Sequence, residues 1–131
     1  MIVDTSVIVA LLKGEADGPR LSAALSAPEA KHISAATFLE TAIVVDANRD
    51  PVMSRRFDEL LRDTSIEIAP VTERQARIAR EAYRDFGRGS GHPAGLNFGD
   101  CFAYALAKDL GEPLLFKGDD FIHTDIEPAL K

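Results

Sequence analysis

Cysteine is almost absent from the chain, and this excludes several kinds of structure. The single cysteine, Cys101, leaves no pair for an intrachain disulfide and too few thiolates for a zinc cluster. The three histidines lie far apart in the sequence, and their spacing matches no zinc motif. A fold held together by disulfides or by structural zinc is therefore excluded.

Long apolar runs are also missing. The longest, Val7 to Leu12, is much shorter than the roughly 20 residues that span a bilayer. No basic segment precedes it, and Asp4 lies just before it, so it does not have the pattern of a signal peptide. We therefore expect a soluble, cytoplasmic protein with no membrane partner.

Basic residues are the minority among the charged ones. The chain has 15 Lys and Arg against 21 Asp and Glu, which gives a formal net charge of -6. At first sight this argues against a nucleic-acid partner, because such partners usually carry a basic excess. The 131 residues are 46% hydrophobic and 27% charged, which is typical of a globular chain. One domain covering residues 1–131 is the expectation.

Short apolar segments alternate with longer amphipathic ones along the chain. The segments 1–3, 31–34, 66–68 and 114–116 have the pattern of buried strands. The segments 7–12, 20–27, 35–47, 51–63, 73–86 and 98–110 have the pattern of helices. This alternation predicts an α/β fold with a mostly parallel central sheet and helices on both faces.

Acidic residues stand at four informative places. Asp4 follows the first strand, and Asp119 and Asp120 follow the last. Glu40 lies among apolar residues of the helix 35–47, and Asp100 lies in the first turn of the helix 98–110. Ligands of such folds bind beyond the carboxyl ends of the strands, so these acids can share one crevice.

Each acid also has a purely structural explanation, which the sequence leaves open. Asp4 can cap the following helix, and Glu40 can pair with an arginine across the core. Asp100 can form a capping box with Asn97, and Asp119 can lie in an ordinary acidic turn. If the acids converge, their repulsion requires a cation, and oxygen ligands favour Mg²⁺ or Mn²⁺. Carboxylate-bound metals of this kind suit hydrolysis of phosphodiesters.

Several of these segments resemble the PIN domain, and in particular the VapC toxins of bacterial type II toxin–antitoxin pairs. The resemblance lies in Asp4-Thr5-Ser6, in Glu40 on its apolar helix, and in residues 96–107 and 113–121. It extends from Met1 to about Asp125 and implies a PIN-like three-layer α/β/α fold. It also implies a Mg²⁺-dependent endoribonuclease that leaves 5′-phosphate and 3′-hydroxyl ends. The implied partners are RNA, a second copy in a homodimer, and a cognate antitoxin with a peptide segment that docks near the acids.

The resemblance also implies which residues form the site. The four implied catalytic acids, of which the first three are metal ligands, are Asp4, Glu40, Asp100 and Asp119. At the last position the chain offers two adjacent acids, and we choose 119 rather than Asp120. Thr5 or Ser6 is expected to bind the first carboxylate or a water, and Asn97 to orient the site.

Two other classes of protein remain as alternatives. A phosphoacceptor signalling domain also places an aspartate beyond a strand, but it needs an adjacent acidic pair that Asp4-Thr5-Ser6 lacks. A catalytically silent PIN-like module would bind RNA or protein without cleaving it. The four retained acids argue against silence.

Five arginines between positions 74 and 88 recur at steps of three or four: Arg74, Arg77, Arg80, Arg84 and Arg88. On one continuous helix they would share a face that could follow RNA phosphates. They could equally form a solvated face paired with Glu73 and Glu81. If the four acids bind metal, they account for most of the net charge of -6, and the acidity no longer argues against RNA.

Overall fold

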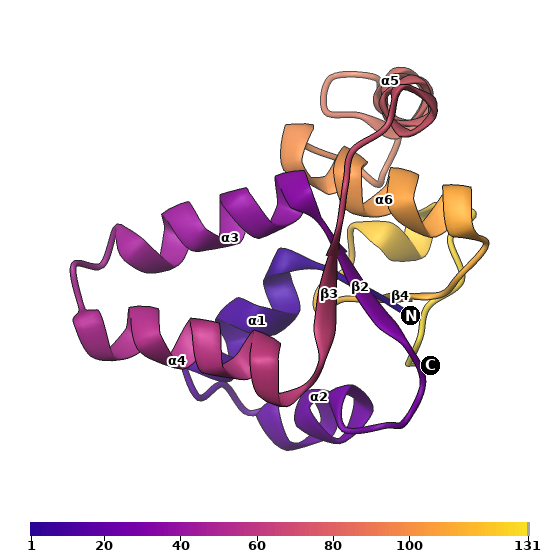
Figure 1. The fold of residues 1–131 in the computed structure, drawn as a ribbon. Helices are drawn as coiled ribbons and strands as arrows, with labels where there is room; N and C mark the ends of the chain where they lie inside the picture. The colour runs from indigo at the N-terminus through magenta and orange to yellow at the C-terminus, as the bar shows by residue number, and fades with distance from the viewer. Residues whose placement is uncertain (131) are drawn as a thin grey trace.

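A four-stranded sheet lies at the centre of the computed structural model, which describes residues 1–130 (Figure 1). The strands are β1 (Ile2–Val3), β2 (Lys31–Ser34), β3 (Ile66–Ala69) and β4 (Leu114–Leu115). They lie in the order β3-β2-β1-β4, and every pair is parallel. The prediction of an α/β fold with a mostly parallel sheet is confirmed, and the sheet is parallel throughout.

Six α-helices connect the strands among the described residues: α1 (Thr5–Leu12), α2 (Gly18–Leu25), α3 (Ala35–Asp46), α4 (Pro51–Asp63), α5 (Glu73–Phe86) and α6 (Phe98–Leu110). A short 3₁₀ turn, η1 (Phe121–His123), follows β4. Ser34, Asp50 and Thr72 each accept a backbone N–H of the helix they precede, so these helices begin where the sequence predicts. Within residues 1–130 no helix combines the length and apolarity needed to cross a membrane.

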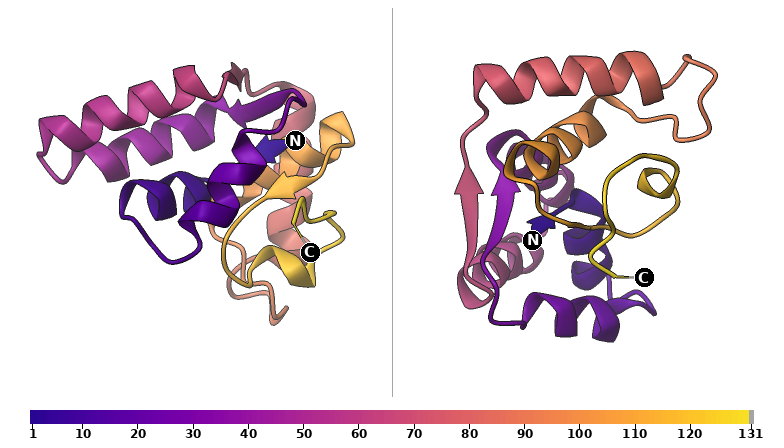
Figure 2. Two further views of the ribbon diagram at one scale, coloured as in Figure 1. Left: turned by 90° about the horizontal axis from the view of Figure 1, so that it is seen from below. Right: turned by 90° about the vertical axis from the view of Figure 1, so that its right-hand side faces the viewer.

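The helices cover both faces of the sheet, because side chains alternate along each strand. Ile2 and Leu114 point into a core shared with α5 and α6. Val3 and Leu115 point the other way, into a core built with α1, α2, α3 and α4. Figure 2 shows α3 and α4 lying side by side in the second layer. The result is the predicted three-layer α/β/α arrangement.

The carboxyl edge of the sheet is where the candidate site residues gather. β1 ends directly before α1, and β2 ends at Ser34, which caps α3. The N-terminal part of α6 packs against α3 at the same edge, as Figure 1 shows. The starts of α1 and α6 and one face of α3 therefore meet beyond the central strands.

Candidate active site

Asp4 is buried at the end of β1, with 6% of its surface exposed. It is the N-cap of α1: its Oδ2 accepts the backbone N–H of Ser6 at 3.0 Å and the hydroxyl of Ser6 at 2.6 Å. Its own N–H donates to the carbonyl of Leu115 at 3.0 Å. Burial raises the pKa of Asp4, the Ser6 bonds oppose this rise, and the charge of Glu40 adds to it. Asp4 therefore caps α1, as the structural explanation predicted, and its carboxyl group also lies close enough to Glu40 to feel its charge.

Glu40 lies on α3 and meets the start of α1. Its Oε1 accepts the hydroxyl of Thr5 at 2.8 Å, and the same hydroxyl lies 2.9 Å from that of Thr41. Among residues 1–130 no arginine pairs with it, so the alternative of an ion pair across the core is wrong. Its helical neighbours Ile43 and Val44 are 60% and 42% exposed. The face that carries Glu40 therefore borders solvent and not the core.

Asp100 forms a complete capping box with Asn97 at the start of α6. Asn97 Oδ1 accepts the N–H of Asp100 at 2.8 Å, and Asp100 Oδ2 accepts the N–H of Asn97 at 3.0 Å. Burial and the charges of Asp4, Asp120 and Glu40 raise the pKa of Asp100 to about 6, against the Asn97 bond, which lowers it. Asp4, Asp120 and Glu40 thus lie close enough for their charges to act on the carboxyl group of Asp100.

Gly99 allows α3 and α6 to approach at this point. A Cβ built on Gly99 would lie 1.8 Å from Oε2 of Glu40, so no side chain fits between the helix and that carboxylate. Sequence reasoning missed this residue as part of the site. The available signal was a glycine inside the first turn of a helix, where it is normally unfavourable.

Two acids follow β4, and the structure distinguishes them. Both are exposed, but only Asp120 contributes charge to the environment of Asp100. Asp119 is not among the charges that raise the pKa of Asp4 or Asp100. This electrostatic contact favours Asp120 as the fourth acid over Asp119, which was chosen from the sequence. The loop is fixed nearby by the N–H of Lys117, which donates to Ser6 Oγ at 2.9 Å.

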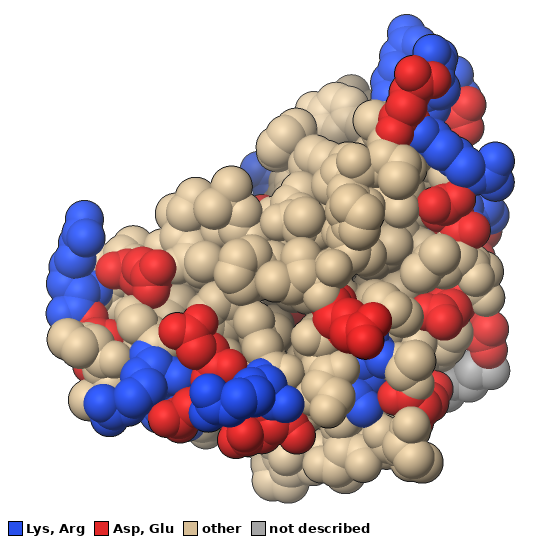
Figure 3. Space-filling model, viewed as in Figure 1, with Lys and Arg blue, Asp and Glu red and all other residues tan. Residues whose placement is uncertain are grey.

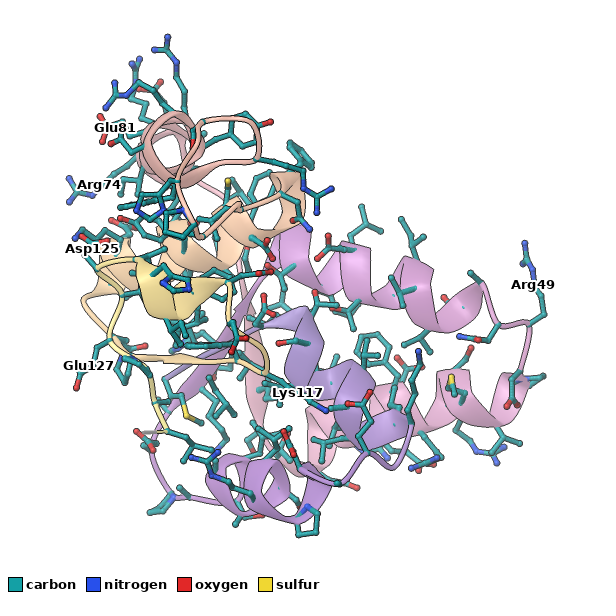
Figure 4. The ribbon with its side chains drawn as sticks, turned by 180° about the vertical axis from the view of Figure 1, so that it is seen from behind. Arg49, Arg74, Glu81, Lys117, Asp125 and Glu127 are labelled. Atoms are coloured by element: carbon teal, nitrogen blue, oxygen red, sulfur yellow. The ribbon has the colours of Figure 1, made fainter. Side chains whose placement is uncertain are left out.

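No basic side chain neutralises the cluster in the part of the chain that the structure describes. Lys117 pairs with Glu15 and Asp17, and Figure 4 shows its side chain extending towards the segment that follows α1. In residues 1–130 no three acidic, histidine or cysteine side chains are close enough to enclose a metal ion by themselves. Mg²⁺ commonly binds one or two carboxylates and keeps several waters. The uncompensated oxygen donors therefore fit a hydrated Mg²⁺ or Mn²⁺.

The five arginines do not form one continuous face. α5 ends at Phe86, as the sequence predicts, so Arg88 lies beyond the helix and the condition for a face shared by all five arginines is not met. Three of the arginines are paired, as Arg74–Asp109 at 2.6 Å, Arg77–Glu73 at 3.1 Å and Arg84–Asp85 at 3.0 Å. Arg80 and Arg88 have no carboxylate partner within the described residues.

The raised pKa values of Asp4 and Asp100 predict an unusual dependence of stability on pH. Asp100 takes up a proton near pH 6 when folded but only near its ordinary value of 3.8 when unfolded. The folded state then binds more protons in this window, so the free energy of unfolding rises as the pH falls from 7 to about 5. Thermal melts in EDTA should show a higher Tm at pH 5 than at pH 7. A lower Tm at pH 5 than at pH 7 would contradict the conclusion that these carboxylates are close together and have no basic partner.

Comparison with known proteins shows which family the chain belongs to. The family model described as PIN domain matches residues 1–127, which contain the whole sheet and every candidate acid. VapC ribonuclease Mb0625 of Mycobacterium bovis and ribonuclease VapC28 of Mycobacterium tuberculosis are each 58% identical to the chain over 130 residues. The match covers 99% of this chain and 98% of each relative. The chain therefore belongs to the VapC ribonucleases of the PIN-domain family, as the sequence predicted.

Solved structures agree on the fold. VapC20 of Mycobacterium tuberculosis, described as a sarcin–ricin loop cleaving toxin, matches with a TM-score of 0.71 over 95% of both chains, at 22% identity. A toxin–antitoxin complex from Klebsiella pneumoniae matches with a TM-score of 0.68 over 92% of this chain and 88% of the other, at 18% identity. The arrangement of sheet and helices is thus shared with proteins of quite different sequence.

Proposed function

We propose that this VapC ribonuclease hydrolyses RNA phosphodiester bonds at a Mg²⁺ site, as the toxin of a type II toxin–antitoxin pair. The observation that carries the proposal is the group of acids around Asp100, which act on one another and have no basic partner among residues 1–130. Membership of the VapC ribonucleases supports the same conclusion. Mn²⁺ has the same preference for oxygen ligands and is a second suitable ion.

Asp4, Glu40 and Asp100 are the acids proposed to hold the ion, one or two of them directly and the rest through its waters, with Asp120 in place of Asp119 as the remaining acid. A bound Mg²⁺ would supply a water of lowered pKa and would stabilise the charge that develops on the phosphate. The protein's part is to hold its carboxylates in fixed orientations. Ser6 and Asn97 do this through hydrogen bonds to Asp4 and Asp100, and Thr5 does it for Glu40.

Cleavage of RNA by the purified protein tests the proposal. With Mg²⁺ present we expect RNA to be cut to products with 5′-phosphate ends, and with EDTA we expect cleavage to stop, because the carboxylates alone cannot activate water. Adding excess Mg²⁺ back should restore the activity. Cleavage that persists in EDTA would contradict the metal site. Binding of RNA with no cleavage under any condition would favour the silent module.

Two protein partners belong to the proposal. An antitoxin that covers the acids would neutralise the enzyme, and both would meet RNA in the cytoplasm. A second copy has a suitable surface on α3, where Leu39, Ile43 and Val44 are exposed. Figure 3 shows that the face carrying α3 has few charges, whereas charges gather over α4 and α5. Light scattering should give twice the chain mass of 14.2 kDa if this surface forms a homodimer.

A further inference from the structure

Phe98 is exposed to an extent that packing does not explain. It is the first residue of α6, two positions before Asp100, and 78% of its surface is exposed. No other large apolar side chain among the described residues is as open to solvent. Burial of a side chain of this size is favourable, and this position forgoes that gain. A single exposed apolar residue needs no explanation, but Phe98 adjoins further apolar side chains, and contiguous exposed apolar surface marks a binding site.

Phe98 is part of an aromatic groove and not an isolated ring. The groove lies between α5 and α6, has a volume of about 290 Å³, and is lined by Phe98, Phe102 and Tyr83 above alanine and cysteine side chains. The rings of Phe98 and Phe102 meet edge to face, with centroids 5.0 Å apart. Tyr83 is 47% exposed. The groove therefore offers aromatic side chains to a planar ligand, at the end of α6 that also carries Asp100.

Positive charge borders this groove. Arg80 lines it, and unlike Arg74, Arg77 and Arg84 it has no acidic partner within residues 1–130. The backbone N–H of Arg88, whose side chain also lacks an acidic partner within residues 1–130, donates to the carbonyl of Leu96 at 2.9 Å. This bond holds the backbone of Arg88 close to the start of α6. Arg80 therefore brings a guanidinium group without an acidic partner in residues 1–130 to the groove, and the backbone of Arg88 passes close to the start of α6.

We infer that Phe98 is a stacking platform for a nucleobase of the RNA substrate, and that Arg80 binds a neighbouring phosphate. The inference rests on the proposed endoribonuclease function and adds a subsite to it. Aromatic rings combined with arginine are the recurring means of binding single-stranded nucleic acid. An arginine in the lining without an acidic partner among the described residues favours an anionic ligand over an apolar peptide. Phe98 and Asp100 point to different sides of α6, so the stacked base belongs to a nucleotide that flanks the cleaved bond.

The chain contains no tryptophan, which allows a direct optical test. In protein carrying Asp100→Asn to prevent cleavage, Phe98→Trp introduces a single indole, and a stacked base should quench its fluorescence. The matched control is Leu110→Trp at the opposite end of α6, where the side chain is 46% exposed and quenching is not expected. An RNA oligonucleotide that the active enzyme cuts is the probe, and inorganic polyphosphate supplies charge without bases. We expect quenching with RNA alone, and only at position 98.

Affinity and kinetics give the second readout. Phe98→Ala and Phe98→Leu should each weaken RNA binding about tenfold, since neither side chain stacks, whereas Phe98→Trp should bind as the parent does. In the active enzyme the same variants should raise KM more than they lower kcat. Active enzyme with unchanged RNA binding in Phe98→Ala would overturn the inference and leave the proposed function standing. RNA binding by the Phe98→Leu variant with the affinity of the parent would also overturn the inference that Phe98 stacks on a base.

Other occupants of the groove would give different results. Loss of dimer mass, or of affinity for a purified antitoxin, with RNA binding unchanged in Phe98→Ala would assign the groove to a protein and overturn the inference. A parent protein that neither cuts nor binds RNA would overturn the proposed function together with this subsite. Gel filtration and light scattering of every variant keep folding and assembly separate from RNA binding.

Discussion

Replacing Asp100 by asparagine will lower the rate of RNA cleavage by about a thousandfold, or roughly 4 kcal/mol, while the protein stays folded. The amide keeps an oxygen that can accept the N–H of Asn97, so the capping box at the start of α6 survives. The substitution removes a charge that Asp4, Glu40 and Asp120 all repel. The variant should therefore melt at a Tm equal to or above that of the parent in EDTA. Single-turnover cleavage assays and thermal melts measure the two effects.

A matched control separates the site from the general loss of one negative charge. Asp85→Asn makes the same chemical change at an exposed residue on α5, which pairs with Arg84 and with no other basic side chain of residues 1–130. We expect this variant to cut RNA at the parent rate. Equal activity of the Asp100→Asn variant and the parent would refute the role of Asp100 as a metal ligand.

Replacing Gly99 by alanine will lower the activity of the enzyme by displacing the carboxylate of Glu40. The new methyl group would stand 1.8 Å from Oε2 of Glu40, and that carboxylate must move because it is the flexible partner in the contact. We expect cleavage to fall about a hundredfold, comparable to the loss of one preorganised group in a catalytic site. Stability should change little, because alanine favours the helix by about 1 kcal/mol over glycine.

The control for this substitution is Gly18→Ala, at the start of α2, where the nearest side-chain atom to a new Cβ lies 3.9 Å away. It should leave cleavage unchanged. A double-mutant cycle then locates the cause: in protein that carries Glu40→Ala, the Gly99→Ala change should cost almost nothing further. Additive losses would show that Gly99 acts by some route other than Glu40.

The sequence predicts the parts of the fold that local chemistry determines. Ser34, Asp50 and Thr72 begin their helices as capping residues should, and Asn97 and Asp100 form the expected box. These features depend on residues a few positions apart. The position of Asp4 beyond a parallel strand is predictable for a similar reason, because the alternation of strands and helices determines which edge the strand ends share.

The features that were missed depend on tertiary packing. The contact between Gly99 and Glu40 exists only because α3 and α6 meet, which spacing along the chain does not reveal. The choice between Asp119 and Asp120 depends on the loop after Gly118, which has a positive φ of 103°. Phenylalanine is a residue type that usually lies in the core, and only the structure shows that Phe98 lies at the surface.

The pairing of β1 with β4 has a consequence for the folding of the chain while it is being synthesised. The strand that positions Asp4 receives its second neighbour from Leu114 and Leu115, and Ser6 receives its bond from Lys117. A nascent chain has released Asp4 and Glu40 from the exit tunnel well before Leu114 and Lys117 follow them. Until residue 117 has emerged, β1 lacks its second neighbour and Ser6 lacks its bond to the loop after β4, so the support of Asp4 is completed by the last part of the sheet to be synthesised.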